Sequence, residues 1–362
     1  MRKLPKTSKA IFPPETQWLD QPTGTPPSNG VPSATVIHFR ELILNFLWRQ
    51  WSALGVAGDA RTSDSWFIDP EALLLFTTTQ ARFDPRLFDE MLDWLWGNAH
   101  SINVQRLKNL QNGVALGHPR IVAAIASWLS KRSSLNKWAL LAQREDPGLP
   151  EPLFIQKDLK PFPMFGAEDE TFLHYRWRRN PIKRRELSQP PNPHQSATLL
   201  SKLRALFGVT ARCEVLLWLL THESGRPADI ARATSWFPKT VENTLNEMAA
   251  SGLIRSARNG REKHYWIKHE EWGFLRSWTK PDGFPQWIEW PRLFSALERI
   301  MFQLSRADLS PILLASELRR VMEDLVPVLA DGQLLSQFAA SREHTGTRYT
   351  EVLLEDFSRL LG

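Results

Sequence analysis

The chain has 362 residues, of which 42% are hydrophobic and 23% are charged, a composition typical of a globular protein with two or three domains. Its formal net charge of +6 suits an anionic partner such as nucleic acid, and equally suits a protein that is only highly soluble. The single cysteine, Cys213, excludes an intramolecular disulfide and favours a cytoplasmic protein. The sequence contains no run of eighteen or more apolar residues, so we expect no membrane-spanning helix.

Residues 1–34 contain seven prolines and few aliphatic side chains. A segment with so little apolar surface cannot offset the conformational entropy lost on ordering, so we expect a disordered arm. Its first residues are basic, and because no apolar stretch follows them we do not expect a secretory signal.

From residue 35 to 145 apolar residues recur at helical spacing, which predicts a helical N-terminal domain. Pro70 and Pro85 each follow an aspartate, and an aspartate N-cap before a first-turn proline predicts that a helix begins there. The order of helices is also that of a second helix-turn-helix without a wing, in which Arg106 and Lys108 would contact phosphates. An ordinary helical bundle gives the same pattern.

The segment 146–195 is again rich in proline and shows little periodicity, which predicts a linker between domains. Its residues 176–185 carry six positive charges: Arg176, Arg178, Arg179, Lys183, Arg184 and Arg185. Such a run can clamp the phosphate backbone of DNA, and it can also be a solvated linker. We favour the clamp, in which case neutralising these residues lowers the salt dependence of DNA binding.

The most specific pattern lies in the middle of the chain. Two short apolar helices are predicted at Thr210–Leu220 and Pro227–Ala233, and Pro238 suits the first turn of a third helix at 238–251. Gly252 can take the left-handed conformation that ends a helix. The third helix has one apolar face, formed by Val241, Leu245 and Met248.

A basic β-hairpin is predicted directly after the third helix. Residues 255–258 and 261–267 are the two strands, and the dipeptide Asn259-Gly260 between them suits a two-residue type I′ turn. Three helices followed by such a hairpin form a winged helix-turn-helix, whose usual work is to dock on DNA.

The segment 203–267 resembles winged-helix transcription regulators of the ArsR/MarR kind. The likeness is carried by Thr210-Ala211-Arg212, Asp229-Ile230-Ala231, Lys239-Thr240-Val241, Gly252-Leu253-Ile254 and Asn259-Gly260-Arg261. The resemblance implies that the third helix reads bases in the major groove through Lys239, Thr240, Asn243 and Asn246. It also implies that the wing contacts the DNA backbone or minor groove through Arg255, Arg258, Arg261 and Lys263.

Two features keep a protein-binding role open. Winged helices also serve as protein–protein modules, and Glu242 and Glu247 on the polar face would repel phosphate if they pointed at it. Asn243 favours DNA, because an asparagine amide can pair with both N6 and N7 of adenine, a contact worth about 1–3 kcal/mol of base discrimination.

Signals for catalysis and for cofactors are lacking in the sequence. It has no P-loop, dinucleotide-binding glycine pattern, HExxH or GxSxG motif, so we expect a protein that is not an enzyme and needs no cofactor. The predicted helix at 227–233 lacks the cysteine pair of metal-sensing relatives, and the nine histidines lack zinc-ligand spacing, so we expect no metal site. Cys213 is expected to be a core residue.

Apolar residues at helical spacing after the wing predict a helical C-terminal domain at 269–362. Such helices often pair across a dimer in the regulators that the segment resembles, and packing within the monomer is an equal alternative. Five tryptophans crowd this part of the chain, and we expect most of them to fill the core, with a ligand-binding aromatic cage as the alternative. They are Trp266, Trp272, Trp278, Trp287 and Trp290.

These patterns predict a mainly α-helical protein with a central winged helix-turn-helix at 196–268 between two helical domains. We expect a cytoplasmic, homodimeric repressor that binds specific double-stranded DNA and no membrane. The alternative is an antitoxin-like or complex-assembly protein with a partner encoded nearby. The overall layout is similar to that of regulators encoded beside nucleotidyltransferase-type toxins in phage-defence systems.

Overall fold

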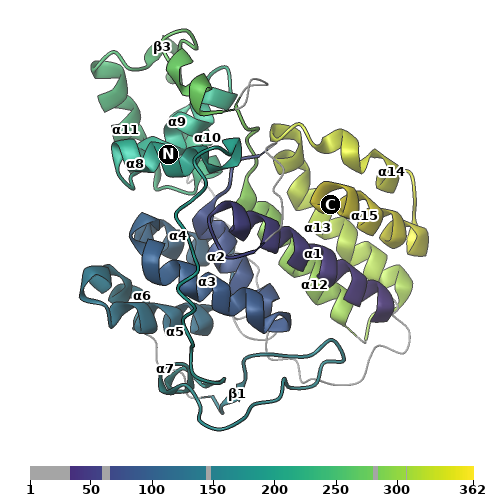
Figure 1. The fold of residues 1–362 in the computed structure, drawn as a ribbon. Helices are drawn as coiled ribbons and strands as arrows, with labels where there is room; N and C mark the ends of the chain where they lie inside the picture. Colours follow the sequence, from purple (N-terminus) through teal and green to yellow (C-terminus); the bar gives the residue numbers. More distant parts are fainter. Residues whose placement is uncertain (1–32, 59–65, 144–147, 280–283, 307) are drawn as a thin grey trace, which may run out of the picture.

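The computed structural model describes residues 33–58, 66–143, 148–279, 284–306 and 308–362. Over these residues the protein is mainly α-helical, with two small two-stranded sheets (Figure 1). The arm expected at residues 1–34 lies outside the described residues except for Ser33 and Ala34, which begin the first helix. None of the described helices is both long and apolar enough to cross a membrane.

The N-terminal helices surround α2 (Pro70–Gln80), and every residue of this helix is buried. Its buried residues include polar ones, Glu71, Thr77, Thr78, Thr79 and Gln80, as well as apolar ones. As the sequence predicts, Asp69 and Asp84 cap α2 and α3 by accepting hydrogen bonds from the amides of Ala72 and Leu87, both at 3.0 Å. The other N-terminal elements are α1 (Ser33–Ala53), η1 (Ala81–Phe83), α3 (Pro85–Asn98), η2 (Ala99–Ser101), α4 (Val104–Val114), α5 (Pro119–Ser130), η3 (Ser133–Trp138) and α6 (Ala139–Ala142).

The C-terminal helices share this core. α12 (Trp290–Ser305) packs on α2, α1 and α4, and Phe294 stacks on Phe76 with ring centroids 4.5 Å apart. The helices of 35–145 and 269–362 therefore pack on one another, and together they form what we call the helical body. The remaining C-terminal elements are α13 (Pro311–Asp331), η6 (Leu335–Phe338), α14 (Ala339–Arg342) and α15 (Gly346–Leu361).

Residues 148–195, which we call the strap, fold back onto the helical body. Within the strap, β1 (Glu151–Pro152) pairs in parallel with β2 (Trp177–Arg178), and α7 (Glu170–His174) precedes β2. Figure 1 shows the strap crossing the lower edge of the helical body and then rising towards α8. The predicted linker is attached to the body because its aromatic residues, Phe172, Tyr175 and Trp177, are buried.

Residues 196–266, which we call the α8–β4 segment, stand at one end of the molecule (Figure 1). Its three predicted helices begin and end within one residue of the expected positions, and Gly252 has the expected positive φ, +77°. The helical elements are η4 (Ser196–Thr198), α8 (Leu199–Phe207), α9 (Ala211–Thr221), α10 (Pro227–Thr234) and α11 (Pro238–Ala250).

The hairpin is present with a turn one residue later than predicted. β3 (Arg255–Asn259) and β4 (Glu262–Trp266) pair antiparallel with Asn259 opposite Glu262, so the two turn residues are Gly260-Arg261 and not Asn259-Gly260. Gly260 has φ +62° and Arg261 has no positive φ, which is the pattern of a type II′ turn with glycine first. The short helix η5 (Gly273–Trp278) follows the hairpin.

Candidate nucleic-acid interface

α11 presents a polar face to solvent because its apolar residues are turned inward. The helix packs on α9 and α10, and its buried apolar residues are the predicted ones, Val241, Leu245 and Met248. The opposite face exposes Lys239, Asn243 and Asn246, with Thr240 half-buried beside them. The four residues expected to contact bases therefore lie on one helix, outside its buried stripe.

Both glutamates of α11 that would repel phosphate are paired with cations of the protein. Glu242 Oε2 lies 3.0 Å from Nζ of Lys239, and Glu247 Oε2 lies 2.5 Å from Nη2 of Arg212. Exposed pairs of this kind contribute little to stability. Their main effect is to reduce the negative charge that α11 shows to an approaching phosphate.

Asn246 is held by the hairpin. Its Oδ1 accepts hydrogen bonds from Nζ of Lys263 at 2.9 Å and from the hydroxyl of Tyr265 at 2.8 Å. The amide oxygen has two lone pairs and both are used, so Asn246 ties α11 to β4 instead of offering an acceptor to adenine. Asn243 is exposed, and no residue within the described ranges holds its amide.

The hairpin places two cations directly opposite each other. Arg258 of β3 faces Lys263 of β4 in the register of the sheet, and like charges opposed in this way destabilise a sheet. Arg258 and Arg261 are both exposed, and neither forms an ion pair with any residue that the structure describes. Uncompensated positive charge at the tip of a hairpin fits contact with an anionic surface.

Arg255 does not share this exposed position. Its guanidinium pairs with Glu271, which lies beyond the hairpin, and also donates to the carbonyl of Gly252 at 3.3 Å. The side chain therefore fixes the base of the hairpin to the chain on either side of it, which differs from the DNA contact that the resemblance implies.

Gly225 and Arg226 position the hairpin, although no local sequence pattern singles them out. Gly225 exchanges two backbone hydrogen bonds of 2.9 Å with Tyr265, and these join the chain between α9 and α10 to β4. A Cβ atom at Gly225 would lie 2.4 Å from the ring of Trp218, so only glycine allows this close approach. Arg226 bridges Asp229 at 2.7 Å and Glu262 at 2.6 Å.

The basic run at 176–185 is directed largely at the helical body. Arg179 is 2% exposed, lies against three phenylalanine rings, and pairs with Asp89 at 2.8 Å. A side chain so enclosed cannot reach a phosphate, so its predicted place in a DNA clamp is wrong. Burial raises the pKa of Asp89, with Arg179 acting in the opposite direction.

Three more cations of the run pair with carboxylates of the same chain: Arg178 with Glu168, Arg184 with Glu186 and Arg185 with Glu90. Arg176 bends the chain with a φ of +64°. Lys183 is exposed and makes no ion pair in the described part of the protein. The run therefore offers an external partner much less positive charge than its composition indicates.

Arg106 is also enclosed, which overturns its predicted contact with phosphate in a second helix-turn-helix. Its guanidinium lies 2.6 Å from Asp69 and 2.8 Å from Glu71, both at the start of α2. Arg204 of α8 extends the cluster to Glu71 at 2.7 Å and to Glu214 of α9 at 2.5 Å. These five residues form what we call the ionic junction, which joins the helical body to the α8–β4 segment.

Attraction within the ionic junction outweighs the cost of burial. Burial alone would raise the pKa of Asp69 and lower that of Arg106, yet their mutual attraction and hydrogen bonds lower the pKa of Asp69 and raise that of Arg106. Arg106 also donates to the carbonyl of Thr234 at 3.0 Å, at the end of α10. Lys108, the other phosphate contact predicted in α4, remains exposed.

Cys213 is a buried residue of α9, as predicted, and its thiol donates to the carbonyl of Gly208 at 3.2 Å. Burial raises the pKa of this thiol to about 12, so at neutral pH it is protonated and unreactive. Over the ranges that the structure describes, no group of three or more His, Cys, Asp or Glu residues is placed to hold a metal ion.

Comparisons of the chain with protein-family models, with curated proteins and with solved structures found no match.

Proposed function

We propose that the α8–β4 segment is a winged helix-turn-helix and that the protein is a sequence-specific DNA-binding regulator, as its resemblance to ArsR/MarR regulators implies. α11 enters the major groove, and the hairpin contacts the backbone or the minor groove. The observation that carries this proposal is the opposed pair Arg258 and Lys263. Such a pair costs stability in the free protein, and an anionic partner relieves its repulsion.

Base recognition falls to the exposed face of α11. Asn243 offers one acceptor and one donor, which match N6 and N7 of adenine. Lys239 and Thr240 lie in the first turn of α11, the part of a recognition helix that contacts base edges. When DNA binds, Lys239 exchanges its exposed pair with Glu242 for a contact with the nucleic acid. Asn246 holds Lys263, and with it the hairpin, at a fixed distance from α11.

We also propose that the protein acts as a homodimeric repressor. Two copies of α11 would then face half-sites about 34 Å apart, one turn of B-DNA. α12 and α15 bury their apolar faces within their own chain, against α2, α1 and α13. The proposed dimer interface therefore lies on a surface other than the buried faces of α12 and α15.

The proposal is tested by selection of DNA fragments from the protein's own genomic neighbourhood at a stated salt concentration. Binding of the selected fragment is then measured by fluorescence anisotropy for Arg258→Ala/Arg261→Ala and for Asn243→Ala. We expect the double variant to weaken binding to every sequence and to lower the slope of log Kd against log salt by about two units. Asn243→Ala should relax the preference for one base pair.

Arg348→Ala is the control, because Arg348 is exposed on α15 and its one ion pair among the described residues is an exposed pair with Glu351. Unchanged binding by both the double variant and Asn243→Ala would contradict the proposal. Binding that remains tight but loses no specificity in Asn243→Ala would contradict the assigned role of that residue alone.

A second candidate function, binding of a protein partner, is favoured by two apolar side chains at the ends of α11. Phe237 and Leu253 are 56% and 47% exposed, and aromatic and aliphatic side chains of this kind supply apolar contact area when a protein partner covers them. Co-expression with the product of the neighbouring gene tests it. We expect Phe237→Ser/Leu253→Ser to abolish co-purification if this candidate is right, while Asn243→Ala/Arg261→Ala retains it.

A further inference from the structure

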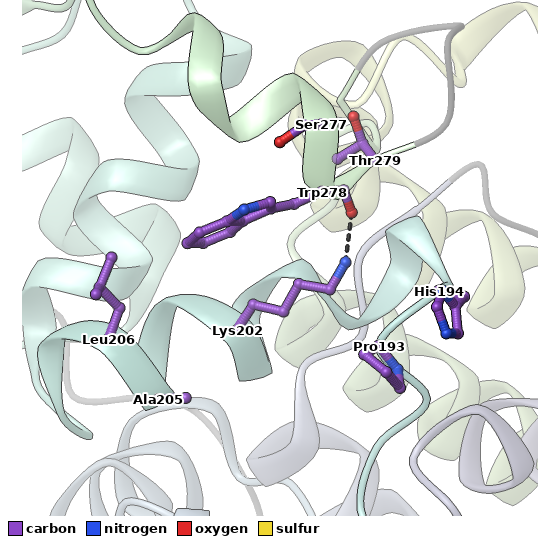
Figure 2. A pocket seen from close by; sticks show the side chains of 8 residues that line it. All are labelled: Pro193, His194, Lys202, Ala205, Leu206, Ser277, Trp278 and Thr279. Atoms are coloured by element: carbon purple, nitrogen blue, oxygen red, sulfur yellow. Dashed lines mark hydrogen bonds between the residues drawn. The ribbon is translucent and has the colours of Figure 1, made fainter.

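A pocket of about 600 Å³ lies where the end of the strap, α8 and η5 meet. Its lining residues are Pro193, His194, Lys202, Ala205, Leu206, Ser277, Trp278 and Thr279. Figure 2 shows the indole of Trp278 extending over α8, across from Leu206 and Ala205. A volume of this size is in the range of sites that hold small molecules.

Lys202 gives the pocket one positive charge. Its ammonium group donates to the carbonyl of Trp278 (Figure 2), and it forms no ion pair with any residue in the described ranges. Partial burial lowers the pKa of this group. An ammonium group has three donors and one is used here, so two remain for an acceptor inside the pocket. The lining residues include no carboxylate.

Trp278 and its neighbours give the pocket a flat apolar side. Trp278 is half-buried, and Leu206 is 55% exposed although it is a large apolar residue. A planar ring placed between them would cover both and would stack on the indole. His194 and Ser277 are exposed lining residues with polar side chains, and the Ser277 hydroxyl donates to the carbonyl of Phe274 at 2.7 Å.

We propose that this pocket binds a small planar ring compound that carries an anionic group, with the anion on Lys202 and the ring against Trp278. Carboxylate and phosphate groups share the chemistry that an ammonium group recognises. Aromatic carboxylates and nucleoside monophosphates are therefore the two sources of such a ligand, and the experiment distinguishes them.

The pocket is connected to the end of α11 by a row of aromatic rings. The centroids of Trp278 and Phe274 are 5.9 Å apart, as are those of Phe274 and Trp272. The Trp272 indole donates to the carbonyl of Leu253 at 3.1 Å, between α11 and β3. Resting on the proposed function, we infer that a ligand on Trp278 shifts the hairpin relative to α11 and so changes the affinity for DNA.

The site is tested first without DNA, by isothermal titration calorimetry on the full chain. Adenosine monophosphate and indole-3-acetate are the two anionic probes, and adenosine and indole-3-ethanol are their neutral counterparts. We expect saturable 1:1 binding of one anionic probe and at least tenfold weaker binding of its neutral counterpart. Lys202→Met and Trp278→Leu should each weaken the same probe at least tenfold, and Lys202→Arg should restore most of the affinity that Lys202→Met loses.

Lys108→Met is the matched control, because Lys108 is exposed and lies in α4, outside the pocket lining. The site is overturned if neither anionic probe saturates, or if Lys202→Met binds as tightly as the unchanged protein. The link to DNA is tested separately, since coupling is reciprocal and DNA must change the affinity for the probe by the same factor that the probe changes the affinity for DNA. If the protein does not bind DNA, the proposed function fails. The calorimetric result still shows whether the pocket binds the anionic probe.

Discussion

Glu298 is a carboxyl group enclosed between α12 and α2 with no cation paired to it among the described residues. Its Oε1 lies 2.6 Å from the hydroxyl oxygen of Thr79, and its Oε2 accepts from the amide of Gly117 at 3.3 Å. The Thr79 hydroxyl lies 2.9 Å from the carbonyl of Phe76. A protonated Glu298 can donate to Thr79, which donates in turn to Phe76, so the neutral acid satisfies every partner. Burial raises the pKa of Glu298 to about 8.

This raised pKa predicts a loss of stability as the pH rises. The folded chain keeps a proton that the unfolded chain releases above its ordinary pKa of 4.5, so the free energy of unfolding falls between about pH 4.5 and pH 8 and levels off above that. In Glu298→Gln the side chain stays neutral, and this part of the fall, roughly a few kcal/mol, should disappear. Urea unfolding at pH 5, 6, 7 and 8 measures it.

The control for Glu298→Gln is Glu355→Gln, which changes an exposed carboxyl on α15. Its pH profile should run parallel to that of the unchanged protein. A profile of Glu298→Gln that is also parallel would show that the buried acid does not retain its proton.

Two asparagines one helical turn apart in α11 should respond differently to substitution. Asn246→Ala removes the acceptor of Lys263 and Tyr265, so we expect a looser hairpin and severalfold weaker binding to all DNA sequences. Asn243→Ala removes an exposed amide, so we expect an altered base preference at one position. Selection from a randomised DNA library reads out both effects, and a lost base preference in Asn246→Ala would reverse the two roles.

At the scale of elements, local signals in the sequence predict where helices begin. Asp69 and Asp84 accept hydrogen bonds from backbone amides of the first helical turn, and the ring of Pro238 restricts its own φ to a helical value. The structure has all three helices where they are expected. The sequence predicts Gly260 in the turn, where the structure has it, but the turn type depends on which residues pair across the strands. Register is a property of two strands together, so the glycine alone cannot fix it.

The strap shows why charge composition misleads. Arg179 and Arg185 meet Asp89 and Glu90, about 90 positions earlier in the chain. Nothing in the local sequence of the run marks these carboxylates as its partners. Trp177, in the same run, is a better indicator that this part of the chain packs on the helical body. A tryptophan side chain is large and apolar, and when it is buried the residues beside it lie close to the core.

We therefore expect the side chain of Trp177 to stabilise the packing of the strap on the helical body. Two guanidinium groups contact its ring, those of Arg82 and Arg120, whose central carbons are 4.7 and 4.5 Å from the ring centroid. Trp177→Ala should lower the free energy of unfolding by about 3–5 kcal/mol, while Trp177→Phe, which keeps an aromatic face, should lose less. Urea unfolding measures both. Equal losses in the two variants would contradict this prediction, because phenylalanine keeps an aromatic face and much of the buried volume that alanine lacks.

At the scale of the whole molecule, the ionic junction is a buried contact between the α8–β4 segment and the helical body. Its carboxylates come from the start of α2 and from α9, and its guanidinium groups come from α4 and α8. The sequence predicts a central domain between two helical domains, but it does not predict this buried contact between the helical body and the α8–β4 segment. The charges come from two parts of the chain, α2 to α4 and α8 to α9, and Glu71 and Arg204 are 133 positions apart, so no local pattern marks them as partners.

Removing one cation from the ionic junction should cost far more than removing an exposed one. Arg204→Met leaves Glu71 and Glu214 short of a partner in a buried site, and we expect the free energy of unfolding to fall by about 3–5 kcal/mol. Arg348→Met, which breaks an exposed pair, should cost less than about 1 kcal/mol. Adding Glu71→Gln and Glu214→Gln to Arg204→Met should recover part of the loss, because neutral amides need no counter-charge. Urea unfolding of the unchanged protein, the two single variants and the triple variant measures these free energies. Equal losses in Arg204→Met and Arg348→Met would show that the buried charges do not hold the α8–β4 segment to the helical body.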